Sequence, residues 1–456
     1  MQRAKKFLFL AFVTFFMSLS AASAGTFNFF SLGWSYSALG PGTISQHALD
    51  SIGQIVYFGS SNTFGPHNYL YAVNIANGQK IWDYNTSLPV NYVSHFEYNN
   101  SEHIIVGTGG SSYIPSQSYV LAFRGSLNNE TLWISPNLNS TVECVGSAES
   151  NPPGTEDVVV GLENGTIIRL SGNNGSKQWQ YNGFVNVRYT DIAQLNDGSI
   201  LVGTSDWAPP PEGHIYCLDK NGILKWSYNS AAGNPLTLVR KFGDINNDGV
   251  PDVVAVFHDG FIYVLDGATG LGMSAPWTPF NVGEIVSDLL CTQDYTGDDF
   301  PDIVVGTAYG DLMIINGRTA TSVLPLTSVG YVVSYIQYMN FSENGVWSSN
   351  KTFAVSVQQN SSDTSQFIYG VNASDLAPMK QFPVPEKMIA KNLFDVRNYT
   401  SPYTGDLLFT ANNKVYLLSG ADIIVPEFPS QIILVVFAVA VWFLVAILRR
   451  EHLRMD

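Results

Sequence analysis

The sequence predicts an all-β protein: an eight-bladed β-propeller closed by an N-terminal strand, with one C-terminal transmembrane helix. Short β-rich runs broken by glycine and asparagine turns fill most of the 456-residue chain, and no sustained helical period interrupts them. A pair of strand-like phrases recurs roughly every 50 residues, which is typical of propeller blades with four short strands each. Apolar runs bracket this body at both ends.

An export signal is expected at residues 1–24. Three basic residues within the first six positions precede an apolar run over 7–17, and small residues at 22–24 provide a cleavage site. The run is short for a membrane anchor, so we exclude it from the fold. An uncleaved anchor is the alternative interpretation.

Residues 25–422 are expected to form the propeller. The first recurring phrase is a short apolar strand, as in 55–59 (IVYFG) and 303–306 (IVVG), and its eight copies follow one another at steps of 42 to 54 residues. A second strand phrase follows each copy, as in 261–266 (FIYVLD), and a turn and an aromatic residue usually come next. Neighbouring sheets would cover each other's faces, which explains the apolar runs.

The ring is expected to close through the N-terminus. The eighth copy, around 386–419, has no aromatic segment after it, whereas residues 33–37 (GWSYS) match the aromatic segment at 225–229 (KWSYN). The N-terminal segment would therefore supply the outer strand of the last blade. A seven-bladed ring with an unattached N-terminal strand is the alternative.

Two acidic loops, in the fifth and sixth copies, predict calcium sites. Oxygen-bearing side chains alternate in both loops, and calcium takes six or more oxygen ligands. The twelfth position of the first loop holds Ala255 rather than glutamate, which excludes an EF-hand. An Asx-rich turn without an ion is the alternative. The expected ligands are Asp244, Asn246, Asp248, the carbonyl of Val250 and Asp252 in the first loop, and Asp294, Thr296, Asp298, the carbonyl of Phe300 and Asp302 in the second.

Two family resemblances follow from these phrases. The loops DINNDGVPDVVAV and DYTGDDFPDIVVG resemble the FG-GAP calcium loops of integrin α-subunit propellers, while HIYCLDKNGILKWSY and FIYVLDGATG resemble the quinoprotein (PQQ-like) propeller repeat. The second resemblance implies tryptophans packed between blades. These would be Trp82, Trp133, Trp179, Trp226 and Trp277.

The cysteines argue against the cofactor of that family. Cys144, Cys217 and Cys291 are far apart in sequence, whereas family enzymes that use the quinone carry a vicinal cysteine pair or a basic axial site, so PQQ is not expected. An odd number of cysteines also argues against a disulfide framework.

Glycosylation sequons are frequent and unevenly placed. None occurs between the sixth and seventh of them, an interval that holds both acidic loops and the insertion 204–214 with Trp207. Our hypothesis is that this sector faces a partner, which Trp207 would contact; chance spacing is the alternative. The sequons are at Asn85, Asn99, Asn129, Asn139, Asn164, Asn174, Asn340, Asn350, Asn360, Asn372 and Asn398.

Charge excludes a nucleic-acid partner. The net charge of the chain is −15. Removing the signal (+3) and the tail after Ser430 (+1) leaves −19 on the intervening body. A strongly acidic surface repels phosphate backbones and suits calcium, cationic partners or simple solubility.

A membrane segment is expected near the C-terminus. A linker at 423–431 contains PEFP, an uncharged apolar run covers 432–448, and a basic tail at 449–456 places the C-terminus inside the cell. This order resembles the PEF-type sorting signal of archaeal surface proteins, which implies an archaeal source and cleavage with transfer to a lipid. A retained single-pass anchor is the alternative.

The sequence thus favours a binding protein over an enzyme. We expect an extracellular, membrane-anchored, calcium-binding propeller that binds a protein or glycan ligand in adhesion or envelope organisation. No zinc, serine-hydrolase or phosphate-loop motif occurs in the chain. Alternatives are a quinoprotein-like dehydrogenase, a carbohydrate-active propeller enzyme and a membrane assembly scaffold.

Overall fold

The computed structural model divides the chain into two compact units, residues 1–421 and residues 422–456. The second unit lies wholly outside the described residues, as do the expected signal, linker, membrane segment and basic tail. Over the part of the chain that is described, no helix combines the length and apolarity needed to cross a membrane. The described ranges are 28–29, 31–38, 43–49, 54–61, 68–99, 101–110, 117–125, 128–150, 155–183, 187–206, 210–231, 233–338, 342–343, 346–347, 352–358, 366–376, 378–384, 391–395, 407–411 and 414–419.

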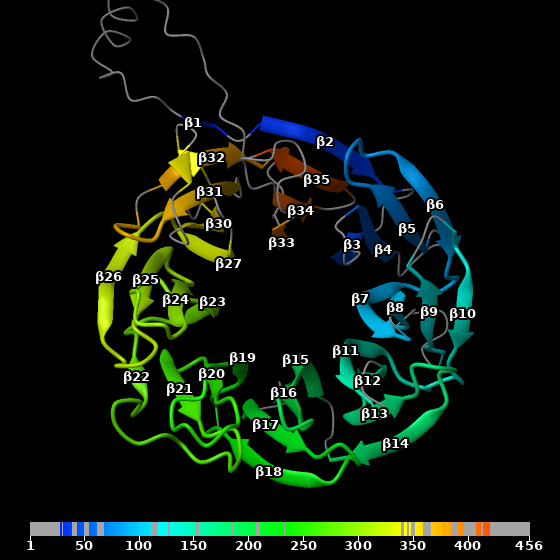
Figure 1. The fold of residues 1–456 in the computed structure, drawn as a ribbon, viewed down its shortest axis with the longest axis horizontal. Helices are drawn as coiled ribbons and strands as arrows, with labels where there is room; N and C mark the ends of the chain where they lie inside the picture. The colour runs from blue at the N-terminus through cyan, green and yellow to red at the C-terminus, as the bar shows by residue number, and fades with distance from the viewer. Residues whose placement is uncertain are drawn as a thin grey trace, which may run out of the picture. The chain divides into compact units, whose positions relative to one another are not determined.

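The first unit is an eight-bladed β-propeller, as predicted, with a four-stranded antiparallel sheet as the core of each blade (Figure 1). Blades 1 and 2 are β3 (Thr43–Leu49), β4 (Ile55–Ser61), β5 (Tyr69–Asn74), β6 (Lys80–Asn85), and β7 (Val90–Tyr98), β8 (Ser101–Thr108), β9 (Val120–Arg124), β10 (Thr131–Ile134). Blades 3 and 4 are β11 (Val142–Glu149), β12 (Glu156–Leu162), β13 (Thr166–Leu170), β14 (Lys177–Asn182), and β15 (Val187–Gln194), β16 (Ile200–Asp206), β17 (Glu212–Leu218), β18 (Leu224–Asn229).

The second half of the ring repeats this order. Blades 5 and 6 are β19 (Leu236–Lys241), β20 (Val253–Phe257), β21 (Phe261–Leu265), β22 (Phe280–Asn281), and β23 (Val286–Gln293), β24 (Asp302–Thr307), β25 (Asp311–Ile315), β26 (Ser322–Ser328). Blade 7 is β27 (Val332–Tyr338), β30 (Thr352–Gln358), β31 (Gln366–Asn372) and β32 (Pro378–Pro383), with the hairpin β28 (Ser342–Glu343) and β29 (Val346–Trp347) inserted. Blade 8 is β33 (Lys391–Asp395), β34 (Leu407–Ala411), β35 (Lys414–Ser419) and β2 (Ser31–Ser37).

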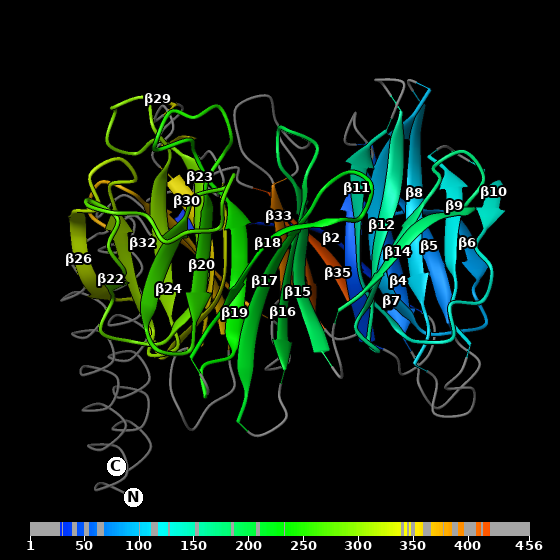
Figure 2. The same ribbon diagram turned by 90° about the horizontal axis from the view of Figure 1, so that it is seen from below.

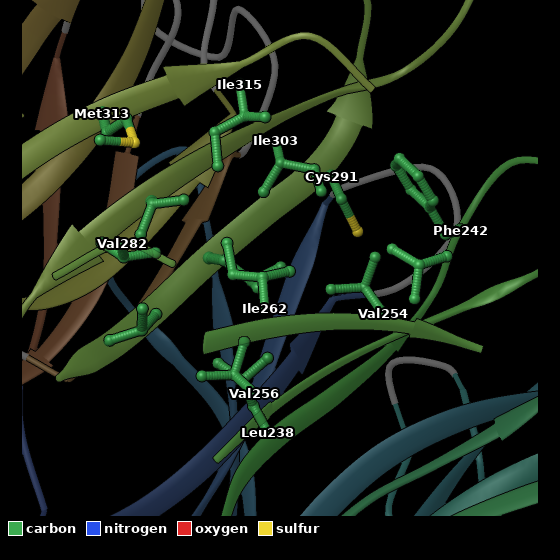
Figure 3. Close-up of a cluster of buried hydrophobic side chains, with 14 of the residues drawn as sticks. Leu238, Phe242, Val254, Val256, Ile262, Val282, Cys291, Ile303, Met313 and Ile315 are labelled. Carbon is green, nitrogen blue, oxygen red and sulfur yellow. The ribbon is translucent and has the colours of Figure 1, made fainter. Parts of the chain in front are cut away.

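Burial follows the position of a strand within its blade. All five residues of β20 (VVAVF) are buried, because a neighbouring blade covers each face of this central strand. The outer strand β14 (KQWQYN) alternates between exposed and half-buried side chains. Figure 3 shows the packing between blades 5 and 6, where Val254 and Ile262 of one sheet and Ile303 of the next belong to one apolar cluster. In the side view of Figure 2, the strands of each blade run from one end of the ring to the other.

The predicted closure is confirmed. Strand β2 pairs antiparallel with β35, with Trp34 opposite Leu417. The side chain of Tyr36 then packs on blade 1, with ring centroids 5.7 Å from Phe58 and 5.8 Å from Tyr71. The first strand of the unit is therefore the outer strand of its last blade, and the ring has eight blades rather than seven.

One strand of the closure was not predicted. Strand β1 (Asn28–Phe29) pairs in parallel with β32, so that blade 7 has a fifth strand. A two-residue strand is too short to show an alternating pattern in the sequence. The N-terminal segment thus joins the outer edges of both blade 7 and blade 8.

Tryptophans connect successive blades, as the repeat implied. Trp133, Trp226 and Trp277 are buried, and each donates its Nε1–H to a backbone carbonyl in the hairpin turn of the next blade. Trp82 is buried as well. The accepting carbonyls, in chain order, belong to Gly172 (2.8 Å), Gly267 (2.9 Å) and Gly317 (2.7 Å).

Trp179 departs from this pattern. Its indole is only half-buried, although it packs between blades 3 and 4 as expected, against a buried cluster and Gly222. Its Nε1–H donates to the carbonyl of Lys220 at 3.0 Å, because blade 4 has a lysine where the turns of blades 3, 5 and 6 have glycine. A Cβ at Gly317 would lie 1.8 Å from the carbonyl oxygen of Pro301, so a lysine cannot approach the sheet as closely as glycine does.

All three cysteines are buried, and none forms a disulfide. Burial raises the pKa of both Cys217 and Cys291 to about 11, so neither thiol is reactive at neutral pH. This agrees with the absence of a disulfide framework predicted from the odd cysteine count.

Candidate metal centres

Both acidic loops lie at one end of the ring, which we call the acidic end. The first loop joins β19 to β20 and the second joins β23 to β24. Because strands within a blade are antiparallel, the turn between the third and fourth strands lies at this same end. Left-handed backbone at Asn247 (φ 59°) and Gly249 (φ 89°), and at Gly297 (φ 84°) and Asp299 (φ 63°), gives both loops their tight curvature.

The last aspartate of each loop is fully buried and holds the blade together. Asp252 accepts the backbone N–H of Ile245 at 2.7 Å and that of Gly267 at 3.2 Å. Asp302 accepts those of Tyr295 at 2.7 Å and Gly317 at 3.0 Å. Each carboxylate therefore links its loop to the hairpin turn that receives a tryptophan from the preceding blade.

Burial raises the pKa of both carboxyl groups. The pKa of Asp252 rises to about 6, although the N–H groups of Ile245 and Gly267 oppose the shift. The pKa of Asp302 is also raised by burial, against the same kind of hydrogen bond. In both cases the cost of burying the charged form outweighs the stabilisation from these hydrogen bonds.

Blade 3 shows how such a carboxylate is neutralised elsewhere in the ring. Asp157 accepts the backbone N–H of Gly172 at 3.0 Å, as its counterparts do, but it also forms a buried ion pair with Arg169, 2.9 Å from Nε to Oδ2. Arg169 stands three residues before the turn glycine; Val264 and Ile314 hold that position in blades 5 and 6. The two acidic loops thus lack the internal cation.

Blade 4 offers a second comparison. Its loop between β15 and β16 contains Asp197, whose Oδ2 lies 2.6 Å from Nζ of Lys225. Between 233 and 338, which the structure describes without a break, no lysine or arginine forms an ion pair with an acidic-loop carboxylate. The nearest guanidinium in blade 6, that of Arg318, lies over the ring of Phe300 at 5.3 Å instead.

In the second loop three predicted ligands converge. One carboxylate oxygen from each of Asp294, Asp298 and Asp302 lies within 4.8 Å of the others. Oxygens that share one Ca²⁺ at roughly 2.4 Å lie at most about 4.8 Å apart, so this spacing suits a single calcium ion. The hydroxyl of Thr296 is close by, 3.4 Å from Asp294 and 3.3 Å from Asp302.

Asp294 is held in its ionised form. Burial alone would raise its pKa, but N–H groups of Gly297 and Asp299 donate to it at 2.6 and 2.8 Å, and the pKa is lowered overall. An ionised carboxylate is the form that binds a metal cation.

The first loop has the same plan with a wider spread of carboxylates. Asp244 accepts the N–H groups of Asp248 at 3.1 Å and Gly249 at 2.9 Å. Asn246 donates its Nδ2–H₂ group to Oδ2 of Asp248 at 3.2 Å and to Oδ2 of Asp266 at 2.9 Å. Among the described residues the close three-carboxylate grouping occurs only in the second loop.

Val250 and Phe300 stand two residues after Asp248 and Asp298, the aspartates at the fifth position of each loop. Val250 donates its N–H to Asp248 at 2.8 Å, and Phe300 donates to Asp298 at 3.0 Å. These bonds fix the orientation of the two carboxylates. Coordination by the carbonyls of Val250 and Phe300 stays a prediction.

Sequence reasoning missed one further polar residue at each centre. Asp266 and Asn316 occupy the same place in the turn between the third and fourth strands, one residue before the turn glycine. The Nδ2 atom of Asn316 lies 2.8 Å from Oδ2 of Asp298 and 3.0 Å from the hydroxyl of Thr296. The repeated turns LDGATG and INGRTA contained this signal, but only antiparallel pairing brings them to the loops.

The amide residue lies in the loop of one centre and in the turn of the other. Blade 5 has Asn246 in the loop and Asp266 in the turn, whereas blade 6 has Thr296 in the loop and Asn316 in the turn. In both, an amide group bridges the fifth-position aspartate to the opposite element. Each centre therefore gathers the carboxylates of its loop, with the carboxylate of Asp266 in blade 5 and the hydroxyl of Thr296 in blade 6, which is a donor set for a hard cation. The two amides face these groups with their Nδ2–H₂ groups and hold them in place.

The predicted glycosylation sites divide between exposed and undescribed positions. Exposed asparagines are Asn85, Asn99, Asn129, Asn139, Asn164 and Asn174, while Asn372 is half-buried. Asn340, Asn350, Asn360 and Asn398 lie outside the described residues, as does Trp207. Trp207 belongs to the connection between β16 and β17, and these strands join at the end of the blade opposite to the acidic loops.

Asp288, on the inner strand of blade 6, is relevant to the alternative that this propeller is an enzyme. Asp288 of β23 accepts the N–H of Ile336 in blade 7 at 2.8 Å and that of Leu289 at 2.9 Å. Burial raises its pKa to about 6, and the charge of Arg240 opposes the shift. The hydrogen bond with Ile336 joins β23 to β27, so Asp288 has a structural role.

Comparisons with known proteins agree with the repeat seen in the sequence. Residues 31–181 of the 456-residue chain match the family described as outer membrane protein assembly factor BamB, a PQQ-like propeller family. No curated protein matches the sequence closely enough to indicate a function.

Several solved structures share the fold. BamB from Moraxella catarrhalis is 15% identical with a TM-score of 0.54, and the match covers 86% of this chain and 99% of that one. Sqt1 from Saccharomyces cerevisiae is 10% identical with a TM-score of 0.63, covering 86% and 99%. The computationally designed Ika8 protein is 16% identical with a TM-score of 0.57, covering 84% and 98%. At such low identity these similarities show the fold alone.

Proposed function

We propose that this PQQ-like β-propeller is a calcium-binding scaffold on the outer face of the cell membrane, where it binds a partner rather than catalysing a reaction. Two calcium ions would bind at the acidic end, one at each centre. The central residues are Asp244, Asp248, Asp252 and Asp266 in blade 5, and Asp294, Asp298, Asp302 and Asn316 in blade 6.

The observation that carries the proposal is the comparison among blades. Equivalent or neighbouring carboxylates in blades 3 and 4 have their own cations, Arg169 and Lys225. The buried Asp252 and Asp302 have none, and two further aspartates precede Asp252 and three precede Asp302 in their loops. Clustered carboxylates without a protein cation destabilise a fold unless an external cation binds.

Calcium would then stabilise the interface between blades 4 and 5 and that between blades 5 and 6. The carboxylates of Asp252 and Asp302 bind the turn glycines whose carbonyls accept Trp226 and Trp277. A cation that fixes these carboxylates would also fix the turns. The ion would act as a structural clip for blades 4 to 6.

Location is inferred from the ends of the sequence. The export signal at 1–24 and the apolar run at 432–448 support an extracellular propeller with a membrane anchor. The family match to an outer membrane assembly factor supports a role as an assembly scaffold at the cell envelope. A scaffold of this kind predicts a stable membrane complex that co-purifies with the chain.

Thermal unfolding with and without calcium tests the proposal. We expect Ca²⁺ to raise Tm by several degrees, and Asp248→Ala and Asp298→Ala each to remove part of that shift. Glu130→Ala, on an exposed outer turn of blade 2, serves as the control and should leave the shift intact. An identical Tm in calcium and in chelator would refute the metal centres.

A further inference from the structure

We propose that the acidic end of blades 4 to 6 is a docking surface for a protein whose contacting face is basic with apolar side chains between its charges. This inference rests on the proposed binding function and says where the partner sits. We call the surface the blade 4–6 turn face. It consists of Ile223, Leu224, Leu271 and Val323 together with the two acidic loops.

The turns between third and fourth strands differ around the ring. Turns of blades 2, 3 and 7 carry the sequons at Asn129, Asn174 and Asn372. Blades 4 and 5 instead have Ile223 and Leu271 as the residue whose carbonyl closes the turn, bonded by the N–H groups of Asp219 and Asp266. The corresponding carbonyl in blade 3 belongs to Ser176, the last residue of its sequon.

The aliphatic side chains at these turns are largely exposed. Ile223 is 64% exposed and Leu271 is 70% exposed. Leu224 at 40% and Val323 at 43%, which begins the outer strand of blade 6, extend the same face. Ile223 and Leu271 hold equivalent places, whereas Leu224 and Val323 lie within the first two residues of the outer strands β18 and β26. All four belong to the same end of three adjacent blades and therefore form a set rather than isolated exceptions.

The net charge of blades 4 to 6 indicates which kind of partner would bind to the blade 4–6 turn face. Residues 187–328, which form these three blades, contain 17 acidic and six basic residues and so carry a net charge of −11. A second copy of the chain would bring the same negative face and would be repelled. A basic protein surface complements the charge, and its apolar side chains would cover the exposed aliphatic groups.

The sequons define where this surface ends. Glycans on Asn174 in blade 3 and on Asn372 in blade 7 would flank the surface, one on each side. They would obstruct the approach of a flat lipid bilayer to this end of the ring. A protein contact confined to three blades is compatible with those flanks. Trp207, whose flanking strands meet at the opposite end, is not part of the surface.

Site-specific photo-cross-linking in the full chain, in its own membrane, tests the proposal. A photoreactive side chain is placed at Ile223, at Leu271 and, as a control, at Ile134, which is 49% exposed on the outer strand of blade 2. We expect protein adducts at the first two positions at least ten-fold above the control, reduced by added salt, with the attached peptide positively charged. Adducts only to lipid or to a second copy, equal yields at all three positions, or no protein adduct at Ile223 and Leu271 would overturn it.

A glycan provides the matched variant. Ile223→Ser completes a sequon at Asn221 that copies the blade 3 turn, and the further change Asn221→Gln removes the acceptor. With that glycan attached, the adduct formed from Leu271 should fall at least ten-fold, and Asn221→Gln should restore most of it. An unchanged adduct beside an occupied glycan would refute the surface.

The metal centres are measured on the same variants. Calcium-dependent melting should stay normal in the glycosylated chain, which also shows that it folds. Loss of the docking result with calcium binding intact would refute the surface alone, whereas loss of calcium binding in the parent chain would refute the proposed function.

Discussion

Three aspartates hold the same place in blades 3, 5 and 6, and what surrounds them differs. Asp157, Asp252 and Asp302 all receive a turn glycine N–H, but only Asp157 has an arginine, Arg169. At the level of single residues, calcium would take the place of that guanidinium. On this proposal the neighbour of the aspartate, rather than the aspartate itself, would determine which blade binds a metal ion.

A first prediction concerns the turn residues that extend the two centres. Asp266→Ala and Asn316→Ala should each weaken calcium binding at one site by about ten-fold. The first removes a carboxylate beside the loop, and the second removes the amide group that holds Asp298 and Thr296. Titration of calcium by calorimetry measures this. Asp311→Ala, in the hairpin at the opposite end of blade 6, is the control, and an equal loss in that variant would contradict a specific role for the turn.

A second prediction concerns Asp288 and pH. Its folded-state pKa of about 6 lies above the value for an unfolded chain, so the folded protein binds this proton more tightly. The contribution of Asp288 to stability is therefore fully present at low pH and is lost as pH rises through 6. Chemical unfolding between pH 4 and 7 should show a smaller fall in Asp288→Asn than in the parent. The same fall in both chains would contradict the shift.

At the scale of elements, successive blades are connected through the hairpin turn between the third and fourth strands, which packs against the start of the second strand of its own blade. The turn glycine must approach the preceding loop closely, and its carbonyl then accepts an indole N–H from the previous blade. Glycine is required at Gly317 by this approach rather than by backbone conformation. The half-buried Trp179, which meets Lys220 instead, shows the looser contact when that glycine is missing.

Gly317→Ala tests this connection. The added Cβ would lie 1.8 Å from a backbone oxygen, so the turn must shift, and we expect a loss of about 2 to 3 kcal/mol from the free energy of unfolding. Gly272→Ala is the matched control, because a Cβ there meets nothing within 4 Å. Denaturant unfolding compares the two. Equal stability would show that the turn adapts and that the close approach is unimportant.

For the molecule as a whole, ring closure depends on the N-terminal segment. Strand β2 completes blade 8 and β1 extends blade 7, so both outer edges are covered by residues that begin the body. Deleting residues 25–37 should lower Tm by about 10 °C or more, because it uncovers the edge of β35 and removes Tyr36 from blade 1. Deleting 25–29 alone should have a much smaller effect. A full-length Tm in the longer deletion would refute closure by this strand.

The sequence repeat made the eight-bladed ring predictable, whereas contacts between residues distant in sequence could not be predicted. Eight copies of one phrase predicted eight blades, and the match between GWSYS and KWSYN predicted the closing strand. The two-residue strand β1 had no pattern to reveal it. Asp266 and Asn316 were missed because they are distant in sequence from the loops that they approach, and Trp207 was grouped with those loops although its flanking strands meet at the other end.

The most direct test of the central claim is the number of calcium ions that the full chain binds. Calorimetric titration of the purified protein should give two sites, with one lost in Asp248→Ala, one lost in Asp298→Ala and both lost in the double variant. Two sites that depend on these residues would establish calcium as the missing cation of blades 5 and 6. No calcium uptake by the folded parent would contradict the account and leave both loops as hydrogen-bonded turns.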